Sequence, residues 1–305
     1  MWRSEPLRRL TDDQVGAVRA LLDATLPAEA HRLAVDPQWI DIARHGRRRY
    51  AGFLAGDDDV LDQPNAYAQL TRQGSSWAIE LVRSPAIGEA VAVDLLRSAL
   101  DVVAAEGGGA VHWWVHEPAD SHVRVAEAAG LSPGRELRQL RRPLPVGKTT
   151  DLVVRPFVPG ADDEAWVALN NRAFAAHPDQ ADWTLATLVD RMAEPWFDAA
   201  GFLLHPDPAS GRLLGFCWTK VHPPVPDDAE GTILGEIYVI GIDPDAGGRG
   251  LGRDLVLAGL DHLHRSSAAT HAMLYVDADN EGAVRLYDRL GFTLQHTDQA
   301  YETTI

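Results

Sequence analysis

One stretch constrains the fold of this chain more than any other: the segment from Leu234 to Gly252, which reads LGEIYVIGIDPDAGGRGLG. Its first half carries the apolar and β-branched residues of a strand, and Asp243 with Pro244 ends that strand. Four glycines then surround one arginine, and apolar residues at helical spacing follow in LGRDLVLAGLDHLHR. The segment therefore predicts a strand, a glycine-rich loop and a helix, in that order.

This order suits the binding of a phosphate or pyrophosphate. A helix N-terminus has unpaired backbone N–H groups and a partial positive charge, both of which attract an anion. Glycines allow the backbone angles of such a loop and leave no Cβ between the amides and the anion. Arg249 can add a charge-assisted contact. A flexible turn without a ligand remains the alternative for this stretch taken alone.

The residues that follow repeat the alternation of strand, turn and helix. The run AMLYV, residues 272–276, predicts a strand, and the DADN turn leads into an amphipathic helix over 281–290 that Gly291 ends. A last strand begins at Phe292. With Glu236 in the first strand, these residues resemble the acetyl-coenzyme A signature of the GCN5-related N-acetyltransferase (GNAT) family. Gly250 and Gly252 match its glycine loop, whereas Gly247 stands where the family has Gln or Arg.

The two halves of the chain resemble each other. Residues 113–115 lead through a polar turn into VRVAEAAGL, and residues 274–276 lead through a polar turn into VRLYDRLGF, so that Gly130 matches Gly291. The resemblance implies an α/β (α+β) fold of two tandem GNAT-like domains, each with a mixed, mostly antiparallel central sheet flanked by helices. The proline-containing stretch around Val146 places the boundary between residues 1–145 and 146–305.

Only the second copy keeps the residues that chemistry would need. Ala126 occupies the position that corresponds to Tyr287, and alanine or valine within residues 89–93 occupies the positions that correspond to Gly250 and Gly252. Counting back from the proline that ends each strand matches Trp77 with Glu236. We therefore expect a degenerate, non-catalytic N-terminal domain and a catalytic C-terminal domain.

Glu236 is the first candidate for catalysis. In a strand it shares a face with Tyr238 and Ile240, and burial of a carboxyl raises its pKa toward that of a useful general base. An ammonium must lose a proton before it can attack a thioester, so a base is needed. The alternative is a glutamate on an edge strand that faces solvent.

Tyr287 is the second candidate for catalysis. The resemblance implies that it protonates the departing thiolate, in direct transfer within a ternary complex, while amides near residues 240–242 polarise the thioester carbonyl. The alternative is a core aromatic at helical spacing. Cys217, the sole cysteine, is expected to be a core residue of a strand rather than a nucleophile that forms an acyl-enzyme.

Acetyl-CoA is the expected co-substrate, and the resemblance implies which positions hold it. They are Ile240, Gly241, Ile242, Gly247, Gly248, Arg249, Gly250, Leu251, Gly252, Arg253, Asn280, Glu281, Gly282, Ala283, Val284 and Arg285.

The resemblance extends to a two-domain branch of the family whose acceptor is the cysteinyl amine of cysteinyl-glucosaminyl-inositol. It implies that the acceptor contacts Asp36, Asp179, Lys220, Glu236 and Tyr275. Two positions depart from the branch: Asp179 is one methylene shorter than the usual glutamate, and Asp36 is only the nearest counterpart of a carboxylate in the first half. A snorkelling lysine is the alternative for Lys220.

Composition argues against a nucleic-acid-binding or membrane-spanning protein. With 305 residues and a net charge of −16, the chain lacks the basic surface of a nucleic-acid binder. A single cysteine, no membrane-spanning run and no signal peptide indicate a soluble cytoplasmic protein, and the charge favours a monomer. The acidic run at residues 57–59 is expected to be a solvated loop, and no metal is expected.

Three rival functions remain open. Gly248, Gly250 and Asp277 imitate a dinucleotide-binding fingerprint, but Arg253 stands where its third glycine belongs. A non-catalytic coenzyme A sensor is the second rival, and the retention of Glu236 in one copy argues against it. The third is an acetyltransferase for another small amine.

Overall fold

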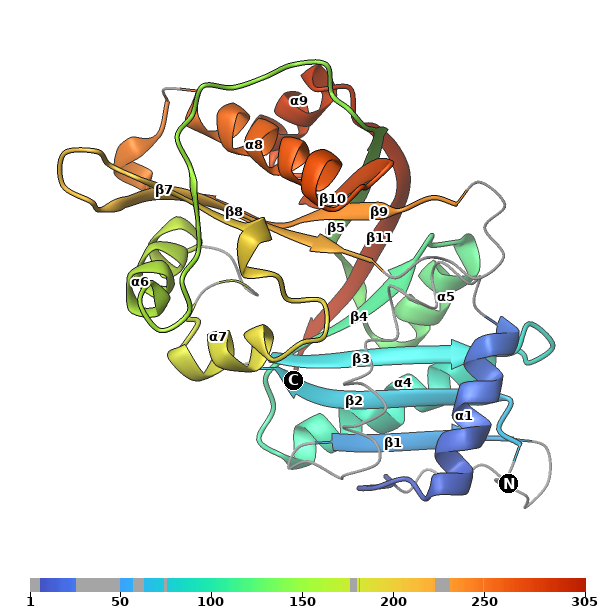
Figure 1. Cartoon of the computed structure of the whole chain (residues 1–305). Coiled ribbons are helices and arrows are strands. Elements are labelled where there is room, and N and C mark those ends of the chain that lie inside the picture. The colour runs from blue at the N-terminus through green and yellow to red at the C-terminus, as the bar shows by residue number, and fades with distance from the viewer. Residues whose placement is uncertain are drawn as a thin grey trace. The chain divides into compact units, whose positions relative to one another are not determined.

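The computed structural model describes residues 6–25, 50–56, 63–73, 76–175, 180, 182–222, 231–248 and 250–305. The chain forms two compact units (Figure 1). Unit 1 comprises Met1–Leu137 and His296–Ile305, and unit 2 comprises Arg138–Gln295. Among the described residues, no helix has the length and hydropathy needed to cross a membrane.

Unit 1 is a sheet with helices on both faces. Its elements are α1 (Asp12–Thr25), β1 (Tyr50–Ala55), β2 (Ala66–Gln73), β3 (Ser76–Arg83), α4 (Glu89–Ala105), β4 (Ala110–His116), α5 (Asp120–Ala129), the first part of β5 (Ser132–Pro143) and the last part of β11 (Thr293–Thr304). One core lies between the sheet and helices α4 and α5, where Leu96 and Val125 pack with Trp113. Helix α1 covers the other face through Val18 and Leu22.

Unit 2 has the same layered arrangement. Its elements are the rest of β5, then β6 (Arg155–Pro156), α6 (Asp163–Ala173), α7 (Leu185–Met192), β7 (Phe202–Pro206), β8 (Leu213–Val221), β9 (Leu234–Ile242), α8 (Leu251–Ser266), β10 (His271–Asp277), α9 (Glu281–Arg289) and the start of β11. Helices α8 and α9 cover one face of the sheet, and α6 and α7 cover the other (Figure 1). The second face holds an aromatic core around Trp166, Phe202 and Trp218.

Strand direction repeats between the units. In unit 1, β1, β2 and β3 pair antiparallel, and β3 then pairs parallel with β4. In unit 2, β7, β8 and β9 pair antiparallel, and β9 then pairs parallel with β10. Gly130 and Gly291, which the sequence matched, both adopt positive φ, at 86° and 81°. The two units are therefore built on one plan.

The units divide differently from the boundary that the sequence suggested. The division falls at Leu137 inside β5, rather than near Val146, and the last ten residues group with unit 1. The physical reason is strand pairing, because residues 298–304 of β11 form an antiparallel ladder with all of β4.

Two strands of unit 2 are not evident from local sequence patterns. In the segment of residues 150–156, only Arg155–Pro156 forms a strand, β6. Strand β5 was not expected, because SPGRELRQLRRP carries four arginines and lacks an apolar face. It forms a strand because it is a neighbour of β10 in the sheet of unit 2, so its backbone groups are paired there.

Candidate active site

The parallel strands β9 and β10 separate partway along their length. Their ladder consists of three residue pairs and ends where Met273 lies beside Glu236. Beyond that point β9 continues to Ile242 and β10 continues to Asp277. The amides of residues 237–242 on this side of β9 are therefore not used by the ladder, and a polar linear molecule could pair with them.

Glu236 lies at the point where the two strands part. Its side chain is buried, and Oε2 lies 2.8 Å from Nε2 of His222, which is buried as well. A carboxylate away from water requires a hydrogen-bonding partner, and His222 supplies one. The expected burial of Glu236 is confirmed. His222 was not found from the sequence, because it lies at the end of the neighbouring strand, fourteen residues earlier.

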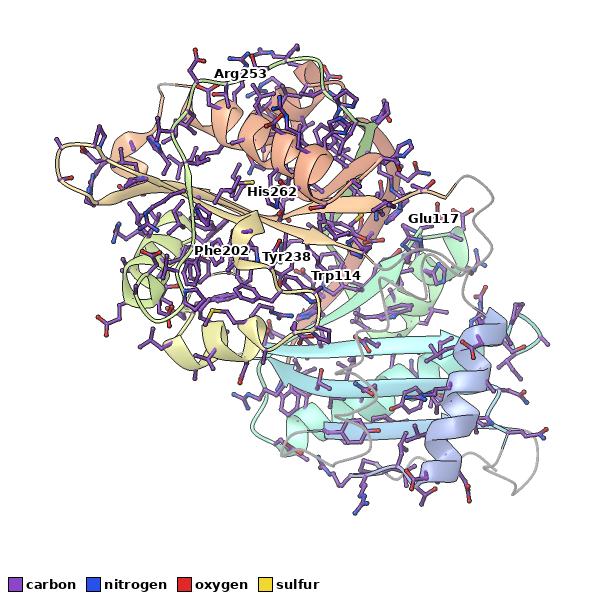
Figure 2. The ribbon with its side chains drawn as sticks, in the orientation of Figure 1. Trp114, Glu117, Phe202, Tyr238, Arg253 and His262 are labelled. Atoms are coloured by element: carbon purple, nitrogen blue, oxygen red, sulfur yellow. The ribbon has the colours of Figure 1, made fainter. Side chains whose placement is uncertain are left out.

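A β-bulge lies next to Glu236. Trp218 pairs with Val239, whereas Thr219 pairs with Ile237, so Tyr238 is an extra residue on β9. The bulge resets the alternation of side chains. Tyr238 stays on the face of the aromatic core, away from α8, as Figure 2 shows, whereas Ile240 packs on the opposite face. The expectation that Ile240 shares a face with Glu236 was therefore wrong.

Lys220 belongs to the same face as Glu236, its cross-strand partner. Its Nζ lies 4.8 Å from the ring centroid of Trp196 and 5.6 Å from that of Tyr238. The Arg191 guanidinium lies 5.9 Å from the Tyr238 ring. Such contacts hold a cation over apolar surface while its N–H donors stay available to a ligand.

Tyr275 lies on β10, two residues beyond the last pair of the ladder. Its hydroxyl accepts a hydrogen bond of 2.9 Å from Nε2 of Gln139. The ring is half-buried, and the neighbouring Leu274 and Val276 pack on the side of α8 and α9. Tyr275 therefore points to the opposite face, which is the face of Lys220 and Glu236.

The glycine-rich turn leads directly into α8, as the sequence predicted. Gly248 and Gly250 adopt φ of 81° and 80°, which favours glycine, and Gly250 is the N-cap. A Cβ on Gly252 would lie 3.1 Å from Cδ1 of Ile242, so the helix start packs closely on the end of β9. Arg253 is exposed at the same end (Figure 2). The N–H groups of this turn can hold a pyrophosphate.

The residue that precedes the turn, Asp243, carries a buried carboxylate. Asp243 is fully buried and accepts hydrogen bonds from Arg172, at 2.8 Å, and from the Asp245 amide. Arg212 lies 3.4 Å away. Burial alone would raise the pKa of Asp243, but these hydrogen bonds and the two guanidinium charges hold the pKa below its usual value. Sequence reasoning gave Asp243 only as the end of a strand.

Tyr287 lies in the core on the α8 and α9 side. It is buried, and its ring contacts Phe292 at 5.7 Å between centroids. Burial, with a smaller contribution from Cys217, raises the pKa of Tyr287 far above its usual value, so the hydroxyl keeps its proton at neutral pH.

Cys217 is fully buried, and burial raises the pKa of its thiol to about 12. A protonated thiol is a poor nucleophile, which agrees with the expected core role. A Cβ on Gly259 of α8 would lie 2.5 Å from its sulfur, so the helix packs closely over it.

The first turn of α9 contains the remaining expected cofactor positions. The Asn280 side chain caps this helix by accepting a hydrogen bond from the Ala283 amide at 3.1 Å. Arg285 is exposed and forms an ion pair with Glu281 at 2.8 Å. Asp36, Asp179 and Arg249 lie outside the described residues, as does the acidic run at 57–59.

Unit 1 contains the same strand separation, but Ile79 stands at its ladder end in place of a carboxylate. Its parallel ladder joins Trp77, Ala78 and Ile79 to β4 and ends there, although β3 continues to Arg83. Ile79 is therefore the residue of unit 1 that corresponds to Glu236, and the sequence-based match of Trp77 with Glu236 was wrong. The residue before α4 is Gly88, whose φ of −64° differs from the left-handed Gly250.

Comparisons with known proteins agree with this geometry. Residues 164–292 match the model of the Acetyltransferase (GNAT) family. The chain is 42% identical to a mycothiol acetyltransferase of Thermobispora bispora over 97% of both chains. It is 41% identical to that of Acidimicrobium ferrooxidans, over 92% of this chain and 91% of the relative.

Solved structures share the fold. A tandem GNAT protein from the clavulanic acid biosynthesis pathway has a TM-score of 0.67 at 14% identity, covering 98% of this chain and 97% of that one. A GCN5-related N-acetyltransferase from Sphaerobacter thermophilus has a TM-score of 0.66 at 21% identity, covering 93% of each chain. The expected tandem fold is confirmed, and the chain belongs to the mycothiol acetyltransferase family of GNAT acyltransferases.

Proposed function

We propose that unit 2 transfers the acetyl group of acetyl-CoA to the cysteinyl amine of desacetylmycothiol (cysteinyl-glucosaminyl-inositol), giving mycothiol and CoA. The relatives' shared name supports this acceptor, as does the resemblance of the sequence to the two-domain branch of the family with the same acceptor. The observation that carries the proposal is the strand separation that begins at the buried Glu236.

The strand separation and the glycine turn would together hold acetyl-CoA. When bound, this co-substrate supplies a thioester whose carbonyl carbon accepts the amine. The N–H groups of residues 250–253 would bind its pyrophosphate, and the part of β9 beyond the β10 ladder would pair with its pantetheine arm. An amide in residues 240–242 would donate to the thioester oxygen as negative charge develops there.

Glu236 would act as the general base. Its carboxylate accepts one proton from the acceptor ammonium, directly or through one water, and the free amine then attacks the thioester carbon. His222 would hold the carboxylate in place through Oε2, leaving Oε1 for the acceptor. His222 is thus a positioning residue rather than a catalytic one.

Tyr287 would complete the transfer. As the new C–N bond forms and the C–S bond breaks, the Tyr287 hydroxyl proton passes to the departing sulfur. The nitrogen of the new amide releases its second proton to solvent, and a solvent proton restores the phenol. The raised pKa keeps the group protonated until that moment.

Lys220 and Tyr275 would bind the acceptor. Both belong to the face of Glu236, and the Lys220 ammonium offers hydrogen-bond donors to sugar or inositol hydroxyls. Asp36 and Asp179 remain proposed acceptor contacts.

An acetyl-transfer assay with a panel of amines tests the proposal. Purified chain, acetyl-CoA and each amine are mixed, and free CoA thiol and acetylated product are both measured. We expect turnover with cysteinyl-glucosaminyl-inositol and equal amounts of the two products. Turnover with another amine alone would show that this amine, rather than cysteinyl-glucosaminyl-inositol, is the acceptor. Binding of acetyl-CoA without any turnover would support a sensor instead.

His222→Ala is expected to lower the kcat of acetyl transfer by about tenfold or more, because the buried carboxylate of Glu236 loses the partner that lies 2.8 Å from its Oε2. Steady-state rates are measured for this variant and for His222→Gln, which can still donate a hydrogen bond to Glu236 and should recover part of the loss. His205→Ala, which removes a histidine bonded to the Val153 carbonyl, is the control. A folded His222→Ala variant with native kcat would leave His222 with a structural role only.

A further inference from the structure

Two strands of unit 1 bring together two histidines and one carboxylate. His116 ends β4 and lies directly opposite Asp298 on β11. His296 comes two residues before Asp298, so the two side chains point to the same face of the strand. Because cross-strand partners also share a face, all three side chains project from one side of the sheet.

The distances show how close the three groups lie. Nδ1 of His116 is 2.8 Å from Oδ1 of Asp298, and Nε2 of His296 is 3.6 Å from the same oxygen. The two imidazole rings meet edge to face, with centroids 4.1 Å apart. One ligand atom from each residue lies within 4.8 Å of the others.

Burial and backbone shape make this cluster more than a surface ion pair. The side chain of His296 is only 6% exposed, whereas those of Asp298 and His116 are 19% and 29% exposed, so the cluster is open at the His116 side. Glu117, which follows β4 (Figure 2), has φ of 45°, an unusual angle for glutamate. Its N–H donates to the Thr297 carbonyl at 3.0 Å, and its Oε2 lies 3.8 Å from Nε2 of His116.

We propose that His116, His296 and Asp298 bind a divalent transition-metal ion of the Zn²⁺ class. Two imidazoles and one carboxylate are a common ligand set for such ions. Ligands of a tetrahedral zinc ion, at bond lengths of about 2.0 to 2.1 Å, lie about 3.3 Å apart. The two distances to the Asp298 oxygen, 2.8 and 3.6 Å, lie on either side of this value. A water on the open side would complete four-coordination.

The site has a structural consequence and is independent of the proposed transfer reaction. Its ligands come from β4 and from the last strand of the chain, separated by 182 residues between His116 and Asp298. A bound ion would therefore tie the C-terminal strand to the sheet of unit 1. This separation also explains why the sequence, which shows no local ligand spacing, led to the expectation of no metal.

Zinc binding to the full chain tests the site. After treatment with a chelator, the chain is titrated with Zn²⁺ against a chromophoric competitor, and its thermal unfolding is followed with and without Zn²⁺. We expect one tightly bound ion per chain and a higher unfolding midpoint with zinc. His296→Gln and Asp298→Asn should each weaken binding at least about tenfold and remove the thermal shift, since each deletes one of three ligands.

A matched control separates this site from binding by other histidines, of which the chain has twelve in all. His112 lies on the same face of β4, beside Trp114, and His112→Gln should bind zinc like the native chain. Circular dichroism and acetyl-transfer activity check that the variants are folded. Folded His296→Gln that binds zinc with native affinity, or a native chain that binds none, would overturn the proposal.

Discussion

Glu236→Gln is expected to lower the turnover number for acetyl transfer by about 10²- to 10⁴-fold, the usual contribution of a general base. Glutamine has the same shape and can still contact His222, but it cannot accept the proton of the acceptor ammonium. The affinity for acetyl-CoA should stay near its native value, because the glycine turn and the part of β9 beyond the β10 ladder are unchanged. Steady-state rates and equilibrium titration with acetyl-CoA measure the two quantities.

A matched control is available in unit 1. Glu80 follows Ile79, the residue at the corresponding ladder end of β3, and it pairs with Gln69 across the sheet. Glu80→Gln removes one carboxylate next to the strand separation of unit 1, outside the proposed active site, and should leave the turnover number unchanged. If Glu236→Gln retains native turnover while the protein is folded, Glu236 is not the base, and the strand separation alone would no longer support the mechanism.

Local patterns in the sequence predicted most of unit 2. The alternating apolar residues of β9, the glycines before α8 and the helix after Asn280 all lie where they were expected. Each depends on residues close together in the chain, where period and turn chemistry are informative. Strand β5 was missed because its arginines hide any apolar period.

The site was less accessible to sequence reasoning because its contacts cross between elements. His222 meets Glu236 from a neighbouring strand, and Arg172 meets Asp243 from a helix 71 residues away. The bulge at Tyr238 shifts the side-chain alternation, and nothing in LGEIYVIGI marks its position. Which side chain faces which core after that point could only come from the paired register.

The second large effect is expected for Tyr287→Phe, which should lower the turnover number by about 10²-fold or more through loss of the proton donor. Phenylalanine keeps the ring contact with Phe292 and the packing on the α8 side, so the free energy of unfolding should change little. A fall in turnover at unchanged acetyl-CoA affinity would mean that the lost interaction forms only in the transition state. Stopped assays of CoA release, together with titration calorimetry, measure both.

Tyr301→Phe provides the comparison that separates chemistry from packing. Tyr301 is also buried, and its ring lies 5.4 Å from that of Trp113 in unit 1, so both variants delete one hydroxyl from an aromatic pair. Burial raises the pKa of both phenols, and both therefore stay protonated at neutral pH. If the two variants lose the same small amount of turnover, Tyr287 is a core residue and another donor must protonate the thiolate. If only Tyr287→Phe loses turnover, the proton that reaches the thiolate comes from the hydroxyl of Tyr287 on α9.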